Sequence, residues 1–299
     1  MLKKIRFKNT TKGNIFFFST FIYGIFLAPF LLYFIVLFTP MMENDNVLQL
    51  MASSLVLTGI PTILYISLGK SVIIPCKPLS LKNIILIIIF SLTILPFSGF
   101  ISHISTLFGE NVSAEIMIEL ERVKFFPGLI AIAVLPAVFE ELFMRGIIQN
   151  FYINVKPSYL FVINGFLFGI FHGNFQQFFY AMILGIAFSM LVYYTKSIFS
   201  SILAHFVVNG SQFVVIYPML NANTDLIDVT DEITASYIVS VILFTIVAIY
   251  VFKKICSTSY DNENKYCVKS IQSYESPFTA SFFIMSIVIV CIILFFSYI

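Results

Sequence analysis

Six polar residues could carry chemistry in this 299-residue sequence, and all of them stand within strongly apolar stretches. Carboxylates and imidazoles can act as general bases, and imidazole and amide N–H groups can stabilise a developing oxyanion. Ionised side chains at membrane depth are expensive, so they normally face a protein interior or a wet cavity. The sequence therefore predicts one buried hydrolytic site, assembled from separate helices. The six candidates are Glu140, Glu141, Arg145, His172, His205 and Asn209.

The stretch with the two acids predicts a buried ion pair beside a second, separate carboxylate. Glu141 and Arg145 are four residues apart, so a helix places them on one face in the favourable order, acid first. Glu140 points about 100° away from Glu141 around the same helix. One acid can therefore be held by Arg145 while the other serves as a general base. A purely structural ion pair with a spare acid is the alternative that this spacing leaves open.

His172 follows a stretch in which glycine recurs at every fourth residue. Gly165, Gly169 and Gly173 form a small-residue face that lets a neighbouring helix approach closely. Such an approach could bring His172 to the acidic segment, although the histidine could also merely bridge two helices. Counted straight at about 1.5 Å per residue from Pro157, His172 lies nearer the outer membrane surface than the acids do. Its place in the site requires a helix that starts later, tilts or is displaced.

His205 and Asn209 are four residues apart and share a helix face. Both can donate hydrogen bonds to a developing oxyanion, but they could equally bind a metal or lock a pair of helices. The third histidine, His103, stands near the outer end of its apolar stretch with no acid nearby in the sequence. We interpret His103 as structural or interfacial.

The elements that must position these groups are transmembrane helices. The chain is 59% hydrophobic and 11% charged, whereas a soluble domain is about 25% charged. This composition predicts an all-α, polytopic transmembrane bundle with a four-helix core that holds the candidate site. A helical span needs about 20 apolar residues, which gives about eight or nine spans. Their expected ranges are 14–38, 47–69, 83–107, 127–149, 158–175, 177–195, 198–217, 233–252 and 277–298.

Charged residues in the loops predict the orientation of the bundle. Lysine and arginine gather in alternate loops, for example at Lys70, Lys77 and Lys82, and acidic residues dominate the others. The positive-inside rule then places the N-terminus on the cytoplasmic side of an integral membrane protein. One acidic loop, residues 110–124, carries apolar residues at four-residue spacing and predicts a short amphipathic helix at the membrane interface.

Several functions find no support in the sequence. The basic residues form no long stripe, so no nucleic-acid partner is expected. There is no HExxH zinc motif and no GxSxG serine elbow. A proton-coupled transporter would need a broken-helix pair or an inverted repeat, and neither is visible. The four cysteines show no CxxC spacing, which predicts free thiols.

Three motifs, taken in order, resemble those of a known family. EExxxR at Glu140–Arg145, FxxxH at Phe168–His172 and HxxxN at His205–Asn209 are similar to the motifs of the CAAX-protease and bacteriocin-processing family of intramembrane endopeptidases. Each motif is short, but each lies on its own apolar span. The resemblance covers about residues 127–215. We therefore divide the chain into N-terminal accessory helices (1–126), a catalytic core (127–217) and C-terminal helices (218–299).

The resemblance implies hydrolysis of a peptide bond in a membrane-associated protein or peptide. In the scheme it implies, Glu140 and His172 activate a water, His205 and Asn209 stabilise the oxyanion, and Glu141 and Arg145 support the site. A metal-free reaction is favoured, with a divalent ion such as zinc on Glu140, His172 and His205 as the alternative. The composition suggests a bacterial cytoplasmic membrane. A non-catalytic relative, such as a bacteriocin self-immunity or regulatory protein, is the competing interpretation.

Overall fold

Helices make up the described part of the chain, and no strand occurs there. The computed structural model describes residues 9–42, 45–68, 74–107, 123–221 and 234–260. The extended pairing within these ranges is limited to one bridge between Cys76 and Ser197. The predicted all-α class is therefore confirmed. In chain order the elements are α1 (Asn9–Ile22), η1 (Tyr23–Leu27), α2 (Ala28–Phe38), η2 (Pro40–Met42), α3 (Asn46–Ser54), η3 (Leu55–Gly59), α4 (Ile60–Ser67), α5 (Leu81–Thr106), α7 (Phe125–Leu129), η4 (Ile130–Val134), α8 (Leu135–Glu141), η5 (Leu142–Ile148), α9 (Gln149–Phe151), α10 (Pro157–Phe171), α11 (Phe175–Thr195), α12 (Ile198–Asn221) and α13 (Ala235–Tyr260).

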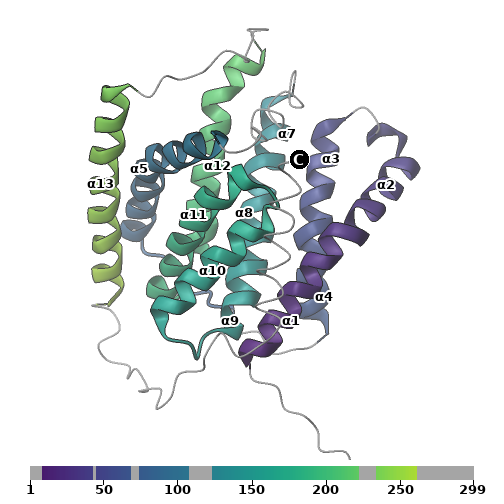
Figure 1. Cartoon of the computed structure of the whole chain (residues 1–299), viewed down its shortest axis with the longest axis horizontal. Coiled ribbons are helices and arrows are strands. Elements are labelled where there is room, and N and C mark those ends of the chain that lie inside the picture. The colour runs from purple at the N-terminus through teal and green to yellow at the C-terminus, as the bar shows by residue number, and fades with distance from the viewer. Residues whose placement is uncertain (1–8, 43–44, 69–73, 108–122, 222–233, 261–299) are drawn as a thin grey trace, which may run out of the picture.

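In the described ranges, seven continuous helical rods are long and apolar enough to cross a membrane. Figure 1 shows them side by side as a bundle, which confirms the predicted polytopic architecture. The predicted span at 277–298 and most of the interfacial helix at 110–124 lie outside the described residues. The seven rods are Asn9–Phe38, Asn46–Ser67, Leu81–Thr106, Phe125–Phe151, Phe175–Thr195, Ile198–Pro218 and Ala235–Ser259.

The helix α10 differs from the span expected at 158–175. It has 15 residues, and at about 1.5 Å per residue it is shorter than the roughly 30 Å hydrocarbon core. In Figure 1 it runs obliquely through the middle of the bundle. Because it is short and tilted, its C-terminal end stays inside the bundle instead of reaching the far surface. That end is where His172 follows.

Three π-helical turns share one cause. η1, η3 and η4 are each followed, two residues later, by a proline: Pro29, Pro61 and Pro136. Proline has no N–H and its ring clashes with the carbonyl four residues earlier, so the helix widens locally. Carbonyl groups freed in this way need other donors in an apolar environment. Beside η3 the donor is the Tyr23 hydroxyl, which bonds the Val56 carbonyl at 2.8 Å.

The helices α10 and α11 pack so closely that two glycines of α10 leave no room for a side chain. A Cβ on Gly165 would lie 2.6 Å from the Met182 carbonyl oxygen, and one on Gly169 would lie 2.7 Å from that of Phe178. Gly173 instead forms the turn after α10, at φ +70°, with no atom within 4 Å of a Cβ. The small-residue face thus consists of Gly165 and Gly169, and Gly173 allows the chain to reverse.

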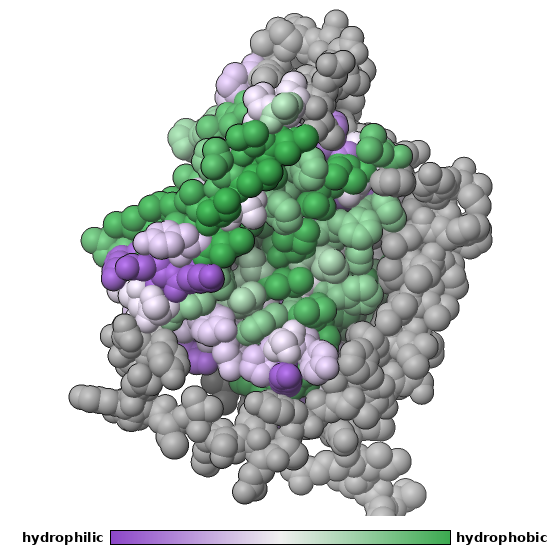
Figure 2. All heavy atoms as spheres, turned by 60° about the vertical axis from the view of Figure 1, so that its left-hand side comes forward, coloured by the Kyte–Doolittle hydropathy of each residue, from purple (hydrophilic) through white to green (hydrophobic). Residues whose placement is uncertain are grey.

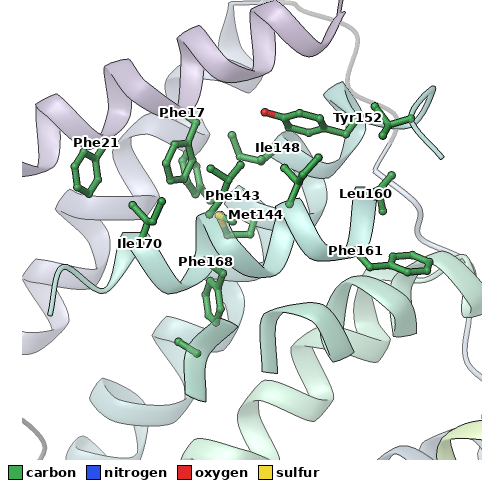
Figure 3. Packing of buried hydrophobic residues seen from close by; sticks show 14 of the residues in the cluster. Phe17, Phe21, Phe143, Met144, Ile148, Tyr152, Leu160, Phe161, Phe168 and Ile170 are labelled. Carbon is green, nitrogen blue, oxygen red and sulfur yellow. The ribbon is translucent and has the colours of Figure 1, made fainter. Parts of the chain in front are cut away.

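Two buried apolar clusters surround the acidic segment. One fills the space between α1, the helix from α8 to α9, and α10, where Phe17, Phe143 and Phe168 lie (Figure 3). The other joins α5, α11, α12 and α13. Among the polar candidates, Glu141, Arg145 and His205 are buried.

The outer surface of the bundle is apolar where a membrane would surround it. Large apolar side chains of α2, α5 and α13 are exposed, including Phe30, Leu92 and Phe244. Figure 2 shows a continuous apolar area on the side formed by α5 and α13, bordered below by hydrophilic residues. The protein is therefore an integral membrane protein.

Candidate active site

One carboxylate joins the acidic segment to α12 and accepts hydrogen bonds from two side chains. The Arg145 Nη1 atom donates to Glu141 Oε1 at 2.8 Å, and His205 Nδ1 lies 2.9 Å from the same oxygen. Because a carboxylate oxygen accepts, the Nδ1 atom of His205 carries the hydrogen. Glu141 is 0% exposed and Arg145 is 1% exposed. A charge buried to this extent is tolerated only with such partners.

Arg145 connects this carboxylate to two further helices. Its Nη2 atom donates to the Gly185 carbonyl of α11 at 3.0 Å. Its guanidinium carbon lies 4.4 Å from the centre of the Phe168 ring of α10, which is within cation–π range. The arginine thus ties α10 and α11 to the helix that carries both acids.

His172 lies at the C-terminal end of α10, next to the same aromatic ring. Its Nδ1 atom is 2.8 Å from the Phe168 carbonyl oxygen, so Nδ1 carries a hydrogen and the neutral ring keeps a lone pair on Nε2. The Phe168 ring centre lies 4.9 Å from that of His172 and 5.9 Å from that of His205. The oblique course of α10 therefore brings His172 to the cluster, which straight counting along the span did not allow.

Glu140 has a different environment from its neighbour Glu141. Its Oε2 atom is buried and has no hydrogen-bond partner among the described residues. The charge of Glu140 acts on both Arg145 and His172, so all three groups lie within electrostatic range. Glu141 thus accepts from Arg145 and His205 through Oε1, whereas no hydrogen bond to Glu140 is described; the Oε2 atom of Glu141 is likewise buried without a described partner.

Asn209 makes a contact that helix spacing alone did not suggest. Its Nδ2 atom donates to the Ile132 carbonyl at 3.1 Å. That carbonyl is four residues before Pro136, which has no N–H to offer it. The bond ties α12 to the widened turn η4, just before the acids. An amide carries two N–H groups, so this bond leaves the second one for another acceptor.

The structure gathers the six sequence candidates into one region of the bundle, on α8, η5, α12 and the end of α10. His205 contacts Glu141 and not Glu140, and Asn209 contacts backbone one turn before the acids. His103 lies in the last turn of α5, and no contact described for it joins it to the cluster.

The residues considered as metal ligands do not form a ligand set in this arrangement. Among the described residues, no three side chains of the histidine, cysteine, aspartate or glutamate types converge on one point. His172 and His205 are packed against the Phe168 ring, and their Nδ1 atoms are already engaged. Because Nδ1 is the engaged atom, each imidazole would have to meet an ion through Nε2, and the described residues show no set of three such ligands gathered around one point.

Two contacts of this cluster fall outside the motifs. One is the Gly185 carbonyl, a backbone acceptor that no side-chain pattern reveals. The other is the Phe188 ring of α11, whose centre lies 5.4 Å from that of His205 and 5.5 Å from the Arg145 guanidinium carbon. In a chain with 36 phenylalanines, no sequence signal distinguishes this one.

The fold and the cluster define a class: a polytopic helical membrane protein with carboxylates, an arginine and imidazoles buried between its helices. Residues 122–211 match a protein-family model described as "Type II CAAX prenyl endopeptidase Rce1-like". This segment contains all six candidates, and the match confirms the CAAX-protease family that the three motifs suggested, which is a family of proteases. Neither the curated proteins nor the solved structures gave a match.

Proposed function

We propose that the protein is an intramembrane endopeptidase that hydrolyses a peptide bond of a membrane-associated protein or peptide. One observation carries the proposal. Glu141 accepts from Arg145 and His205 through Oε1, whereas no hydrogen bond to the adjacent Glu140 is described. The Oε2 atoms of both acids are buried without a described partner. A buried, unpaired acceptor next to a cationic cluster is what a water-activating base requires.

In this proposal Glu140 and His172 activate the attacking water. Glu140 accepts one proton of the water, and the Nε2 lone pair of His172 accepts a hydrogen bond from its other O–H. The Phe168 carbonyl keeps the hydrogen of His172 on Nδ1 and thereby keeps Nε2 as an acceptor. After attack on the peptide carbonyl, Glu140 returns the proton to the leaving amine. The base is thus regenerated within one cycle.

The oxyanion that forms on the peptide carbonyl would be stabilised from α12. Glu141 holds the hydrogen of His205 on Nδ1, so donation to the oxyanion requires a second proton on Nε2, that is, an imidazolium. The second N–H of Asn209 is the other proposed donor. Donors of this kind are worth roughly 10²–10³ in kcat each.

We propose a reaction without a metal ion, because the chain has no HExxH motif to supply two histidine ligands from one helix face. The test is metal analysis of the purified protein, together with cleavage assays with and without a chelator. One equivalent of zinc with chelator-sensitive cleavage would overturn this part of the proposal.

We further propose that the N-terminus is cytoplasmic, in a bacterial cytoplasmic membrane. The support is the distribution of lysine and arginine among the loops. Lys253 and Lys254, exposed near the end of α13, lie on the predicted cytoplasmic side. Cysteine-accessibility labelling of single-cysteine variants in membrane vesicles would test this orientation.

Cleavage by purified protein in proteoliposomes tests the function. The probe is a library of quenched-fluorescent peptides, each tethered to the bilayer by an N-terminal acyl chain. We expect Glu140→Gln to abolish cleavage while circular dichroism and thermal unfolding remain unchanged. His103→Asn is the matched control for a polar substitution within a span and should keep full activity. Undiminished cleavage by Glu140→Gln would remove this residue from the mechanism and favour the non-catalytic interpretation.

A further inference from the structure

The Phe188 ring makes a contact that the three motifs do not account for. It is 1% exposed, and it lies nearly parallel to the His205 imidazole, at 29° and 5.4 Å between ring centres. The Arg145 guanidinium carbon is 5.5 Å from its centre. Phe168 contacts the same two groups, at 4.4 Å from the guanidinium carbon and 5.9 Å from the imidazole centre. Both hydrogen-bond partners of Glu141 therefore contact both phenylalanine rings.

The His205 imidazole can adopt more than one ring orientation beside Glu141. A half-turn about its last side-chain torsion exchanges the positions of the ring nitrogen and ring carbon atoms, and rotation out of plane would break the bond to the carboxylate. A parallel aromatic ring opposes rotation out of plane because the imidazole would collide with it. A stacked aromatic face also favours the charged imidazolium through its quadrupole. A leucine of similar volume would fill the space without either effect.

We propose that Phe188 is a positioning residue: it holds the His205 imidazole in the plane that presents Nδ1 to Glu141 and Nε2 to the substrate. This inference rests on the proposed function for its catalytic consequence. The geometric part, the orientation of the imidazole, stands independently of whether the protein cleaves peptides. Phe188 acts through His205 and need not touch the substrate.

The matched comparison is between Phe188→Leu and Phe90→Leu. Both phenylalanines belong to the buried cluster that joins α5, α11, α12 and α13. Phe90 packs against Phe252, with ring centres 5.4 Å apart, and has no described ring contact with the candidate site. Both substitutions remove a ring from the same cluster, so a general loss of packing affects both. Only the first removes a neighbour of His205.

The ¹⁵N chemical shifts of the His205 imidazole test whether Phe188 positions this ring. If Phe188 had only a structural role in the core, these chemical shifts would not change. The chain contains three histidines, so ¹⁵N-histidine labelling gives few signals, and His205→Gln assigns the one of interest. Ring nitrogens with and without hydrogen differ widely in chemical shift. In the parent protein we expect His205 to show a hydrogen-bonded Nδ1–H. In Phe188→Leu we expect this Nδ1–H signal to weaken and shift, because the ring leaves the plane of its bond to Glu141, with the other two histidines unchanged.

For the reaction, we expect Phe188→Leu to lower kcat roughly tenfold to a hundredfold with little change in KM, because a small misplacement of a catalytic group has this effect. Phe90→Leu should keep kcat near the parent value, and Phe188→Tyr, which keeps the ring, should restore the His205 signal. If Phe188→Leu does not fold, Phe188→Met replaces it. An unchanged His205 resonance, or a changed resonance with full kcat, would overturn the inference. Failure of Glu140→Gln to abolish cleavage would instead count against the proposed function alone.

Discussion

Replacement of Arg145 by methionine tests the charge balance on which the candidate site depends. In the parent protein Glu141 Oε1 accepts from Arg145 at 2.8 Å and from His205 at 2.9 Å, with both side chains of the Glu141–Arg145 pair at 0% exposure. Arg145→Met keeps most of the apolar volume but removes the charge that faces the carboxylate. Glu141 then remains buried, with His205 as its remaining described partner.

The expected loss of stability follows from these contacts. Removal of one partner of a buried ion pair typically costs about 3–5 kcal/mol, because the other charge is left uncompensated. Loss of the contact with the Phe168 ring adds to this, whereas His205 partly compensates Glu141. We therefore expect Arg145→Met to lower the free energy of unfolding by about 3 kcal/mol, the lower end of that range.

A double-mutant cycle isolates the interaction. Glu141→Gln removes the buried charge, so Arg145→Met should be less damaging in that background, with a coupling of roughly 2–3 kcal/mol. Unfolding in detergent can be followed by circular dichroism, since the chain contains no tryptophan for fluorescence. A loss below about 1 kcal/mol for Arg145→Met, or a coupling near zero, would refute the claim that Arg145 neutralises Glu141.

Two further predictions concern the packing that brings the site together. Gly165→Ala should destabilise the protein by about 1–3 kcal/mol, because its Cβ would lie 2.4 Å from Ile186 Cγ1 and force α10 away from α11. Gly210→Ala is the control. Its Cβ would have its nearest neighbour at 3.7 Å, so this variant should keep the parent melting temperature. Asn209→Ala should cost about 1 kcal/mol, because it removes the hydrogen bond to the Ile132 carbonyl that ties α12 to η4. Thermal unfolding of each variant by circular dichroism measures these losses, and a Gly165→Ala protein as stable as the parent would show that α10 and α11 do not pack at this distance.

Local patterns in the sequence predicted what depends on neighbours along one helix. Apolar length and composition indicated the spans, because a helix in lipid must be about 20 apolar residues long whatever surrounds it. The four-residue spacing of Glu141 and Arg145 predicted their ion pair, since residues at that spacing lie on one helix face. The spacing of Gly165 and Gly169 likewise predicted a close helix contact.

Contacts between distant segments could not be predicted in this way. The bond between Glu141 and His205 joins residues 64 positions apart, and nothing in either motif states which acid the histidine meets. The length of the apolar stretch at 158–175 suggested a full span, whereas the structure has the short, oblique α10. The tilt of a helix is set by packing against neighbouring helices, so the stretch itself does not reveal it. The bond from Asn209 to Ile132 depends on a carbonyl freed by Pro136 on another helix.

By itself, the sequence determined that this is a helical membrane protein with few ionisable groups in its spans, and it determined which groups those are. The physical reason is that lipid constrains each segment separately, through its length and its charges. Only the tertiary structure decided that Glu141 is the acid that accepts from Arg145 and His205, that no described hydrogen bond engages Glu140, and that two phenylalanine rings contact Arg145 and His205. Those outcomes depend on how the helices cross, and crossing is a property of packed surfaces that no single segment contains.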